Sequence, residues 1–216
     1  TRGPRPAARA AGLGPLVLVV GHQAEKVEQR MEPLDDGDLR FVLQAEQNGT
    51  GHAVQVCEPE LKDLSGDVLV LAGDVPLIRR ETLRELLEEH QQRAAAATVL
   101  TAVLSDPTGY GRVLRNEAGD VTAIREHRDC SEAELSVAEI NSGIYVFRLP
   151  DLLSALSELR PENDQGEYYL TDTLEILRNR GERVAAQVCG DENEIAGIND
   201  REQLADMEAL VEERRS

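Results

Sequence analysis

Short apolar runs alternate along the chain with stretches whose apolar residues recur at helical spacing. An apolar run that fills a whole strand is typical of a strand buried on both faces of a sheet. Residues 83, 86, 87 and 90 follow the spacing of an amphipathic helix. The pattern predicts strands at residues 16–20, 40–43, 68–72, 98–104 and 183–188, and helices at residues 23–31, 52–57, 83–90, 152–159 and 170–180. Strands that alternate with helices favour an α/β fold with a largely parallel sheet.

Residues 106–147 show a different pattern, in which short strands surround turns. The turns read DPTGYG and NEAG, and the strands around them read RVLR, DVTAIRE and SGIYVF. This spacing favours a small antiparallel or mixed insertion. Further along, residues 194–198 read as a short extended piece, and Asp200 is the predicted N-cap of a final helix with Gln203 as its capping-box partner.

Composition narrows the functional classes. Asp and Glu number 41 against 23 Lys and Arg, which gives a net charge of −18. Nucleic-acid binding is disfavoured, because no basic excess is available to neutralise a phosphate backbone. The three cysteines lie far apart and form neither a metal motif nor a disulfide framework, which favours a cytoplasmic protein. We find no apolar run long enough for a membrane span.

The run at 68–72 ends in Gly73-Asp74, and Pro76 prevents its simple continuation. Asp74 is therefore expected at the carboxyl edge of a sheet, where ligands bind in open α/β folds. A carboxylate at that edge is suited to holding a divalent cation against phosphates. A turn-forming aspartate would give the same local pattern.

The segment QAEQNGTGHA, residues 44–53, follows a strand and opens a helix. Its glycines let a ligand approach the backbone, and a helix N-terminus offers unpaired N–H groups. Gln44 and Gln47 can each donate and accept hydrogen bonds, which suits recognition of a base edge. An ordinary glycine-rich turn between a strand and a helix is the structural alternative.

Asn199 precedes the predicted cap Asp200 and is expected at another strand–helix junction. Asp74 and Asn199 are both oxygen donors, and together they match the sparse protein ligation that Mg²⁺ shows when it also binds phosphates. An asparagine that satisfies its own backbone at a helix entry is the alternative.

Three polar residues in or beside the insertion, Glu126, Asn141 and Thr171, are candidates for hydrogen bonds to sugar hydroxyls. Each one alone is more often a surface or turn residue. The four histidines show no ligand spacing, and no nucleophile–base pair is evident. A phosphate monoester is already an anion, so its attack on a nucleotide needs charge neutralisation and alignment rather than a strong base.

Eight strings, in order along the chain, carry a family resemblance. They are VVGH (19–22), LQAEQNGTGHA (43–53), GDVPLI (73–78), DPTGYGR (106–112), REH (125–127), INSGIYVF (140–147), QGEYYLTD (165–172) and GIND (197–200). Together they resemble the uridylyltransferase domain of the bacterial bifunctional N-acetylglucosamine-1-phosphate uridylyltransferase / glucosamine-1-phosphate acetyltransferase, an enzyme of cell-wall precursor synthesis. The resemblance implies a Rossmann-like nucleotidyltransferase domain with a small antiparallel sugar-binding insertion.

The resemblance also implies the reaction and the residues that serve it. UTP and N-acetylglucosamine 1-phosphate would give UDP-N-acetylglucosamine and pyrophosphate, with Mg²⁺ as the cofactor. By position, Asp74 and Asn199 are the implied catalytic metal ligands. The implied nucleotide contacts are Gln44, Gly49, Thr50, Ala72, Gly73 and Asp74. The implied sugar contacts are Gly111, Glu126, Asn141, Tyr169 and Thr171.

The chain also departs from the family pattern at both ends. The family's first strand, its glycine-rich phosphate loop and its C-terminal β-helix are not recognisable. We therefore expect a disordered remnant at residues 1–9, an incomplete nucleotidyltransferase domain at 10–199 and a helix at 200–216 that leads to the absent β-helix. The expected consequences are a monomeric fragment of a trimeric parent and weak or absent turnover.

The sequence leaves two alternative functions open. One is a nucleotidyltransferase for another sugar 1-phosphate, and the other is a non-catalytic remnant that binds nucleotide sugars. The strings INSGIY and GEYYLTD argue against the first alternative, and the unrecognised phosphate loop supports the second.

Overall fold

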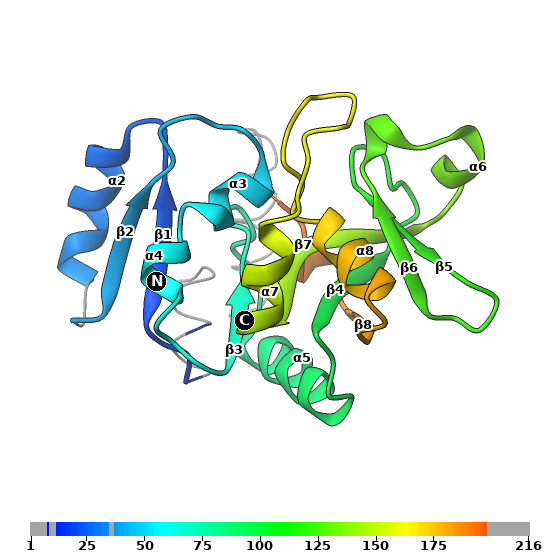
Figure 1. Cartoon of the computed structure of the whole chain (residues 1–216), viewed down its shortest axis with the longest axis horizontal. Helices are drawn as coiled ribbons and strands as arrows, with labels where there is room; N and C mark the ends of the chain where they lie inside the picture. The colour runs from blue at the N-terminus through cyan, green and yellow to red at the C-terminus, as the bar shows by residue number, and fades with distance from the viewer. Residues whose placement is uncertain (1–7, 9–11, 35–36, 198–216) are drawn as a thin grey trace, which may run out of the picture.

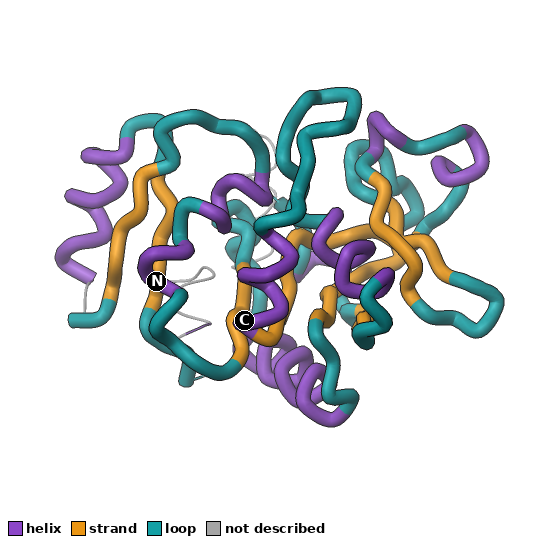
Figure 2. Tube along the Cα trace, in the orientation of Figure 1, coloured by secondary structure: helices purple, strands orange, loops and turns teal. Residues whose placement is uncertain are grey.

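The computed structural model describes residues 8, 12–34 and 37–197 (Figure 1). Strands and helices alternate through the first half of the chain and again near its end (Figure 2). The strands are β1 (Leu16–Val20), β2 (Leu39–Leu43), β3 (Asp67–Val70), β4 (Ala97–Val103), β5 (Arg112–Arg115), β6 (Val121–Arg125), β7 (Glu139–Arg148) and β8 (Val184–Val188). The α-helices are α2 (Ala24–Met31), α3 (Thr50–Gln55), α4 (Glu58–Leu61), α5 (Arg80–Gln92), α6 (Glu132–Leu135), α7 (Leu149–Leu156) and α8 (Asp172–Asn179). Three short 3₁₀ helices are η1 (Glu32–Leu34), η2 (His127–Asp129) and η3 (Glu192–Glu194).

The strands form a parallel pair, β1–β2, and a six-stranded sheet. Strands β3 and β4 are both antiparallel to β7, and β8 is parallel to β4, so β3, β4 and β8 share one direction. The reversed strand β7 lies between β3 and β4, and the antiparallel hairpin β5–β6 extends the sheet beyond it. The predicted α/β fold with mostly parallel strands and an antiparallel insertion is confirmed.

Helices cover both faces of this sheet. Along β7, Tyr145 and Phe147 enter one apolar cluster with side chains of α7 and α8, which lie side by side in Figure 1. The alternate residues Ile144 and Val146 enter a second cluster with Leu83 of α5. Successive side chains of a strand point to opposite faces, so one strand supplies both halves of the core.

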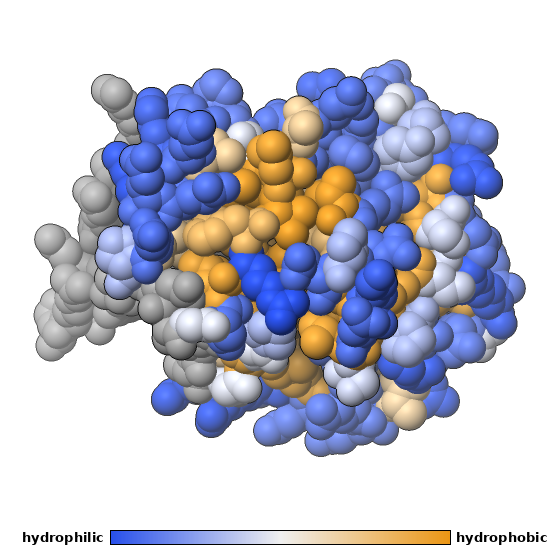
Figure 3. All heavy atoms as spheres, turned by 60° about the vertical axis from the view of Figure 1, so that its left-hand side comes forward, coloured by the Kyte–Doolittle hydropathy of each residue, from blue (hydrophilic) through white to orange (hydrophobic). Residues whose placement is uncertain are grey.

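A third apolar cluster joins β1 and β2 to β3. Buried Cys57 and Leu149 pack in it with half-buried Val17, Val42 and Val68. Seen with the β1–β2 side turned forward, apolar side chains gather in the middle of the face (Figure 3). This packing, rather than strand pairing, connects the β1–β2 pair to the main sheet among the described residues.

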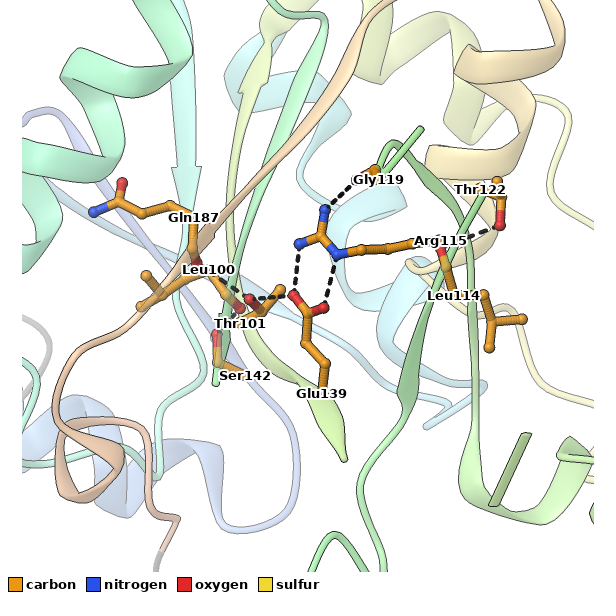
Figure 4. Close-up of polar contacts among 9 residues, drawn as sticks. All are labelled: Leu100, Thr101, Leu114, Arg115, Gly119, Thr122, Glu139, Ser142 and Gln187. Carbon is orange, nitrogen blue, oxygen red and sulfur yellow. Dashed lines mark hydrogen bonds and ion pairs between the residues drawn. The ribbon is translucent and has the colours of Figure 1, made fainter. Parts of the chain in front are cut away.

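A partly exposed ion pair fastens the hairpin to the sheet (Figure 4). Arg115 of β5 donates from Nε and NH2 to the two carboxylate oxygens of Glu139 on β7, at 2.7 and 2.6 Å. Thr101 of β4 donates to the same carboxylate at 2.8 Å. Burial on its own would raise the pKa of Glu139, but the hydrogen bonds from Arg115 and Thr101 bring that pKa below its ordinary value. Glu139 therefore joins three strands, and Arg115 also donates to Gly119 O in the NEAG turn at 2.7 Å.

Two details differ from the sequence predictions. Residues 140–147, predicted as part of the insertion, lie in β7, a central strand of the main sheet, because their alternating apolar side chains fill both faces. The predicted extended piece at 194–198 is wrong where the chain is described, since η3 ends at Glu194 and Ile195 closes its turn through a hydrogen bond to Glu192 O. The predicted helix that begins at Asp200 lies outside the described residues.

Candidate nucleotidyl transfer site

The turn after β2 carries Gln44 at the carboxyl end of the strand. The Gln44 N–H donates to Val20 O at 2.8 Å and extends the β1–β2 ladder by one residue. The side-chain nitrogen donates to Gly49 O at 3.1 Å and lies 3.2 Å from His52 Nδ1. A carbonyl oxygen only accepts, so the amide nitrogen must face Gly49 and the amide oxygen must face away. No described residue donates to Gln44 Oε1, which leaves an acceptor oxygen at this turn.

Gly49 is required by a close approach of two chain segments. It has φ of 102°, and a Cβ added there would lie 2.6 Å from Tyr168 O. Backbone hydrogen bonds seal the contact, because Gly51 N donates to Tyr168 O at 2.7 Å and Tyr168 N donates to Asn48 O at 2.8 Å. Thr50 Oγ1 accepts from Leu170 N at 3.1 Å. The predicted glycine-rich turn is thus built against residues 168–170.

The loop after β3 presents Asp74 between two anchored flanks. Ala72 on one side packs partly buried into the α5-side cluster, and Val75 and Ile78 on the other side are buried in that cluster. Gly73 and Asp74 themselves are exposed. The Asp74 carboxylate therefore faces solvent at the carboxyl end of β3, as the sequence predicted. Its expected partner, Asn199, lies outside the described residues.

Strand β7 is partly open at Asn141. On one edge of β7, β3 pairs with residues 145–148 and β5 pairs with Ile140, which leaves the stretch between them without a ladder partner from either strand. Asn141 N donates to Gly111 O at 2.9 Å, and Asn141 Oδ1 accepts from Gly143 N at 3.0 Å. The opening places Asn141 between the ends of the two neighbouring strands, with Gly111 on one side.

Glu126 is the central acid of this opening. Its Oε1 accepts a hydrogen bond from Thr171 Oγ1 at 3.2 Å, and its Oε2 lies 3.3 Å from where a Cβ on Gly111 would be. Burial raises the pKa of Glu126, the Thr171 hydroxyl partly offsets that effect, and Asp129 and Asp172 raise the pKa further. The absence of a side chain at Gly111 thus leaves room for a partly buried carboxyl group.

Tyr169 occupies a more peripheral position. It is buried, and its hydroxyl accepts a hydrogen bond from Gln165 Nε2 at 2.8 Å. Burial raises the pKa of Tyr169. Its neighbours Leu170 and Thr171 connect the two halves of the site, since Leu170 N binds Thr50 and Thr171 binds Glu126. The structure thereby brings the glycine-rich turn and the Glu126 opening to either side of one segment.

Comparison with known proteins identifies the family. The sequence profile named Nucleotidyl transferase matches residues 7–193. The chain belongs to the nucleotidyl transferase family. The resemblance that the eight sequence strings predicted is therefore confirmed at the level of the family.

Curated relatives of this nucleotidyl transferase are similar over almost the whole chain. The "Bifunctional protein GlmU" of Acetivibrio thermocellus is 48% identical over 205 residues, which make up 94% of this chain and 43% of that protein. Proteins of the same name are 50% identical over 210 residues in Corynebacterium aurimucosum and 49% identical over 211 residues in Pelobacter propionicus. These matches cover 95% and 98% of this chain but 43% and 45% of the two relatives. The chain spans less than half the length of these relatives.

The sequence did not point to two further residues of the candidate site, Tyr145 and Asp172. Tyr145 is buried, and its pKa is raised first by burial and then by the charge of Glu126. Asp172 begins α8, and burial, with a contribution from Glu175, raises its pKa to about 6. Side chains along a strand alternate between its two faces, so Tyr145, four residues after Asn141, lies on the same face of β7. The sequence pattern alone could have indicated this.

The Asp74 carboxylate has the chemistry of a magnesium ligand. Mg²⁺ prefers oxygen ligands, keeps several waters and uses few protein side chains when it also binds phosphates. The exposed Asp74 carboxylate meets that requirement, and Asn199 would add an amide oxygen. Within residues 8, 12–34 and 37–197, no group of three or more His, Cys, Asp or Glu is arranged to hold a metal ion. None of the described helices is long and apolar enough to cross a membrane.

Proposed function

We propose that this chain carries the site for uridylyl transfer from UTP to N-acetylglucosamine 1-phosphate, which yields UDP-N-acetylglucosamine and pyrophosphate. One observation carries the proposal. Two hydrogen bonds between separate parts of the sequence meet at the opening in β7, from Asn141 N to Gly111 O at 2.9 Å and from Thr171 to Glu126 at 3.2 Å, and the Glu126 carboxylate fills the space that a side chain on Gly111 would need. A sugar with several hydroxyl groups needs such a set of donors and acceptors.

Recognition of the base is assigned to the turn after β2. The Gln44 amide is oriented by Gly49 O and His52, so its oxygen is available to an N–H donor. Uracil presents an imide N–H on its pairing edge, whereas cytosine presents an acceptor at the same position. Gln44 in this orientation favours uracil, because a cytosine would place two acceptors against each other. Gly49 and Thr50 form the turn that holds this arrangement.

Recognition of the sugar is assigned to the Glu126 opening. Ionised Glu126 accepts hydrogen bonds from sugar hydroxyls, and Thr171 orients its carboxyl group. Asn141, held by its contact with Gly143 N, keeps its amide N–H₂ directed to a partner outside its own turn. Tyr169 supports the segment that carries Thr171.

Chemistry at phosphorus requires alignment and charge neutralisation. The sugar phosphate is itself an anionic nucleophile, so none of these side chains has to act as a strong base. Asp74 and Asn199 would hold Mg²⁺, which supplies charge neutralisation to the phosphates when bound. Ala72 and Gly73 bring the nucleotide beside Asp74, and the exposed Gly73 backbone allows close approach.

The proposed enzyme works in the cytoplasm. Free Cys57, Cys130 and Cys189 and the acidic composition suit a cytoplasmic enzyme that supplies a cell-wall precursor and binds no nucleic acid. In isolation the chain is proposed to be monomeric.

Calorimetry with UDP-N-acetylglucosamine, UDP, CDP and GDP tests the proposal, together with pyrophosphate release from UTP and N-acetylglucosamine 1-phosphate. We expect UDP-N-acetylglucosamine to bind more tightly than UDP, and UDP more tightly than the other two nucleotides. Equal affinity for all ligands, or preference for a different nucleotide, would overturn the proposal. Glucose 1-phosphate in place of the acetylated sugar tests the sugar assignment.

A further inference from the structure

One buried carboxylate joins the Asp74 loop to the segment after β8. Glu194 is fully buried at the end of η3. Its Oε2 accepts hydrogen bonds from Arg79 N at 3.0 Å and from Thr82 Oγ1 at 2.6 Å. Its Oε1 accepts from Arg79 Nε at 2.6 Å and also pairs with Arg79 NH2. Four donors from the start of α5 thus converge on the two oxygens of a residue more than 110 positions away.

The contact replaces an ordinary helix cap. Arg79 is the N-cap residue of the 13-residue helix α5, and its own side chain makes no capping hydrogen bond. The Glu194 carboxylate lies at this end of the helix and accepts from the N–H of Arg79 and from the Thr82 hydroxyl, at a position where the helix dipole favours an anion. The hydrogen bond that the Arg79 side chain donates to Glu194 raises the pKa of Arg79, in keeping with a strongly held ion pair.

Both sides of the contact are held firmly. On the Glu194 side, Asp191 Oδ1 accepts from Asn193 N at 3.1 Å and from Asn193 Nδ2 at 3.0 Å, which fixes the turn of η3. Ile195, the next residue after Glu194, is buried in the same cluster as Val75 and Ile78 of the Asp74 loop. The two segments therefore meet through apolar packing as well as through the ion pair.

Spacing along the chain gives the contact its significance. Asp74 lies five residues before Arg79, and Asn199 lies five residues after Glu194. We propose that Glu194 is a positioning residue, which by holding Arg79 and Thr82 fixes the Asp74 loop against η3 and Ile195. This inference rests on the proposed function, since it concerns the Mg²⁺ site of that reaction.

Energetics favour a positioning role over a purely stabilising one. Burying the Glu194 carboxylate costs its hydration, and its ion pair with the half-exposed Arg79 side chain offsets that cost only in part, so the contact contributes little net stability. Its hydrogen bonds do specify one geometry, and metal sites depend on such outer contacts for their affinity. A clamp that holds the Asp74 loop against the rest of the fold is an arrangement in which that geometry matters.

The test compares Arg79→Met and Glu194→Gln with the control Arg80→Met. The Arg79 side chain is 55% exposed, so its removal weakens the clamp with little effect on the core. Arg80 is an exposed neighbour that pairs with Glu81. For each variant, Mn²⁺ affinity is measured by electron paramagnetic resonance with UDP-N-acetylglucosamine bound. The affinity for UDP-N-acetylglucosamine itself is measured in EDTA, and amide hydrogen exchange is followed in residues 73–79 and 191–197.

We expect Mn²⁺ affinity to fall about tenfold in Arg79→Met and Glu194→Gln, as for other contacts that orient metal ligands, with nucleotide-sugar affinity in EDTA unchanged. Amide exchange should rise in both segments, and Arg80→Met should match the wild type. Unchanged Mn²⁺ affinity in Arg79→Met and Glu194→Gln, with or without a lower melting temperature, would overturn the positioning role alone. A wild-type chain that binds neither UDP-N-acetylglucosamine nor Mn²⁺ would instead overturn the proposed function, and this inference with it.

Discussion

Thr171 donates a hydrogen bond to Glu126 across 45 residues of sequence, at 3.2 Å between Oγ1 and Oε1. This contact joins the start of α8 to the end of β6, and it is the point at which the proposed sugar site closes. Burial raises the pKa of Glu126, and the hydrogen bond from the Thr171 hydroxyl lowers it, so Thr171 favours the ionised form of Glu126.

Replacing Thr171 with Val should weaken sugar recognition without affecting the nucleotide. Loss of one hydrogen bond to a carboxylate costs about 1 to 2 kcal/mol, which corresponds to about a 5- to 30-fold lower affinity for UDP-N-acetylglucosamine. Affinity for UDP should remain as in the wild type. Thr122→Val is the matched control, because Thr122 makes its side-chain hydrogen bond to Leu114 O in the hairpin. Calorimetry that showed equal losses for both ligands would place Thr171 outside the sugar site.

Replacing Gly49 with Ala should destabilise the fold. The new Cβ would lie 2.6 Å from Tyr168 O, and the residue would have to keep φ of 102°. We expect a loss of at least about 2 kcal/mol in the free energy of unfolding, measured with urea. Gly190→Ala is the control, since nothing lies within 4 Å of its Cβ position. Equal stability of the two variants would contradict the close approach.

Asp172 should make stability depend on pH in the acidic range. Its folded pKa of about 6 lies above the unfolded value of about 3.9, so the native state binds a proton more tightly than the unfolded state. The ionised group therefore costs stability above pH 6, and that cost disappears as the pH falls from about 6 towards 4. Relative to Asp172→Asn, the wild type should gain about 1 kcal/mol between pH 7 and pH 4, a value reduced for solvent screening. Urea unfolding of both proteins at the two pH values measures this difference, and a constant difference would contradict it.

Replacing Gln44 with Leu should reduce discrimination between uracil and cytosine. The oriented amide oxygen is the proposed acceptor for the imide N–H, so UDP affinity should fall about tenfold while CDP affinity changes little. Gln47→Leu serves as the control, because Gln47 lies in the same turn and is exposed. If the Gln47 variant lost the preference and the Gln44 variant kept it, base recognition would be assigned to Gln47 instead.

The Asp74 edge and the glycine-rich turn were accessible from sequence for a simple physical reason. An apolar run followed by Gly-Asp and Pro specifies a strand and its end locally, and the glycines of residues 49–51 mark a turn in the same way. Their positions in the structure agree with this reading. Residues 140–147 were misassigned, because an apolar, β-rich stretch looks the same in a central strand as in a hairpin.

By itself, the sequence determined the α/β class, the order of the elements and the types of chemistry at the strand ends, because these depend on spacing and residue type over short stretches. Only the tertiary structure decided which distant residues meet. Three contacts join segments that are far apart in sequence. They are the hydrogen bond from Thr171 to Glu126, the packing of Tyr168 against Gly49, and the hydrogen bonds from Arg79 to Glu194. Such contacts depend on how helices pack on both faces of the sheet around β7, which no local pattern encodes.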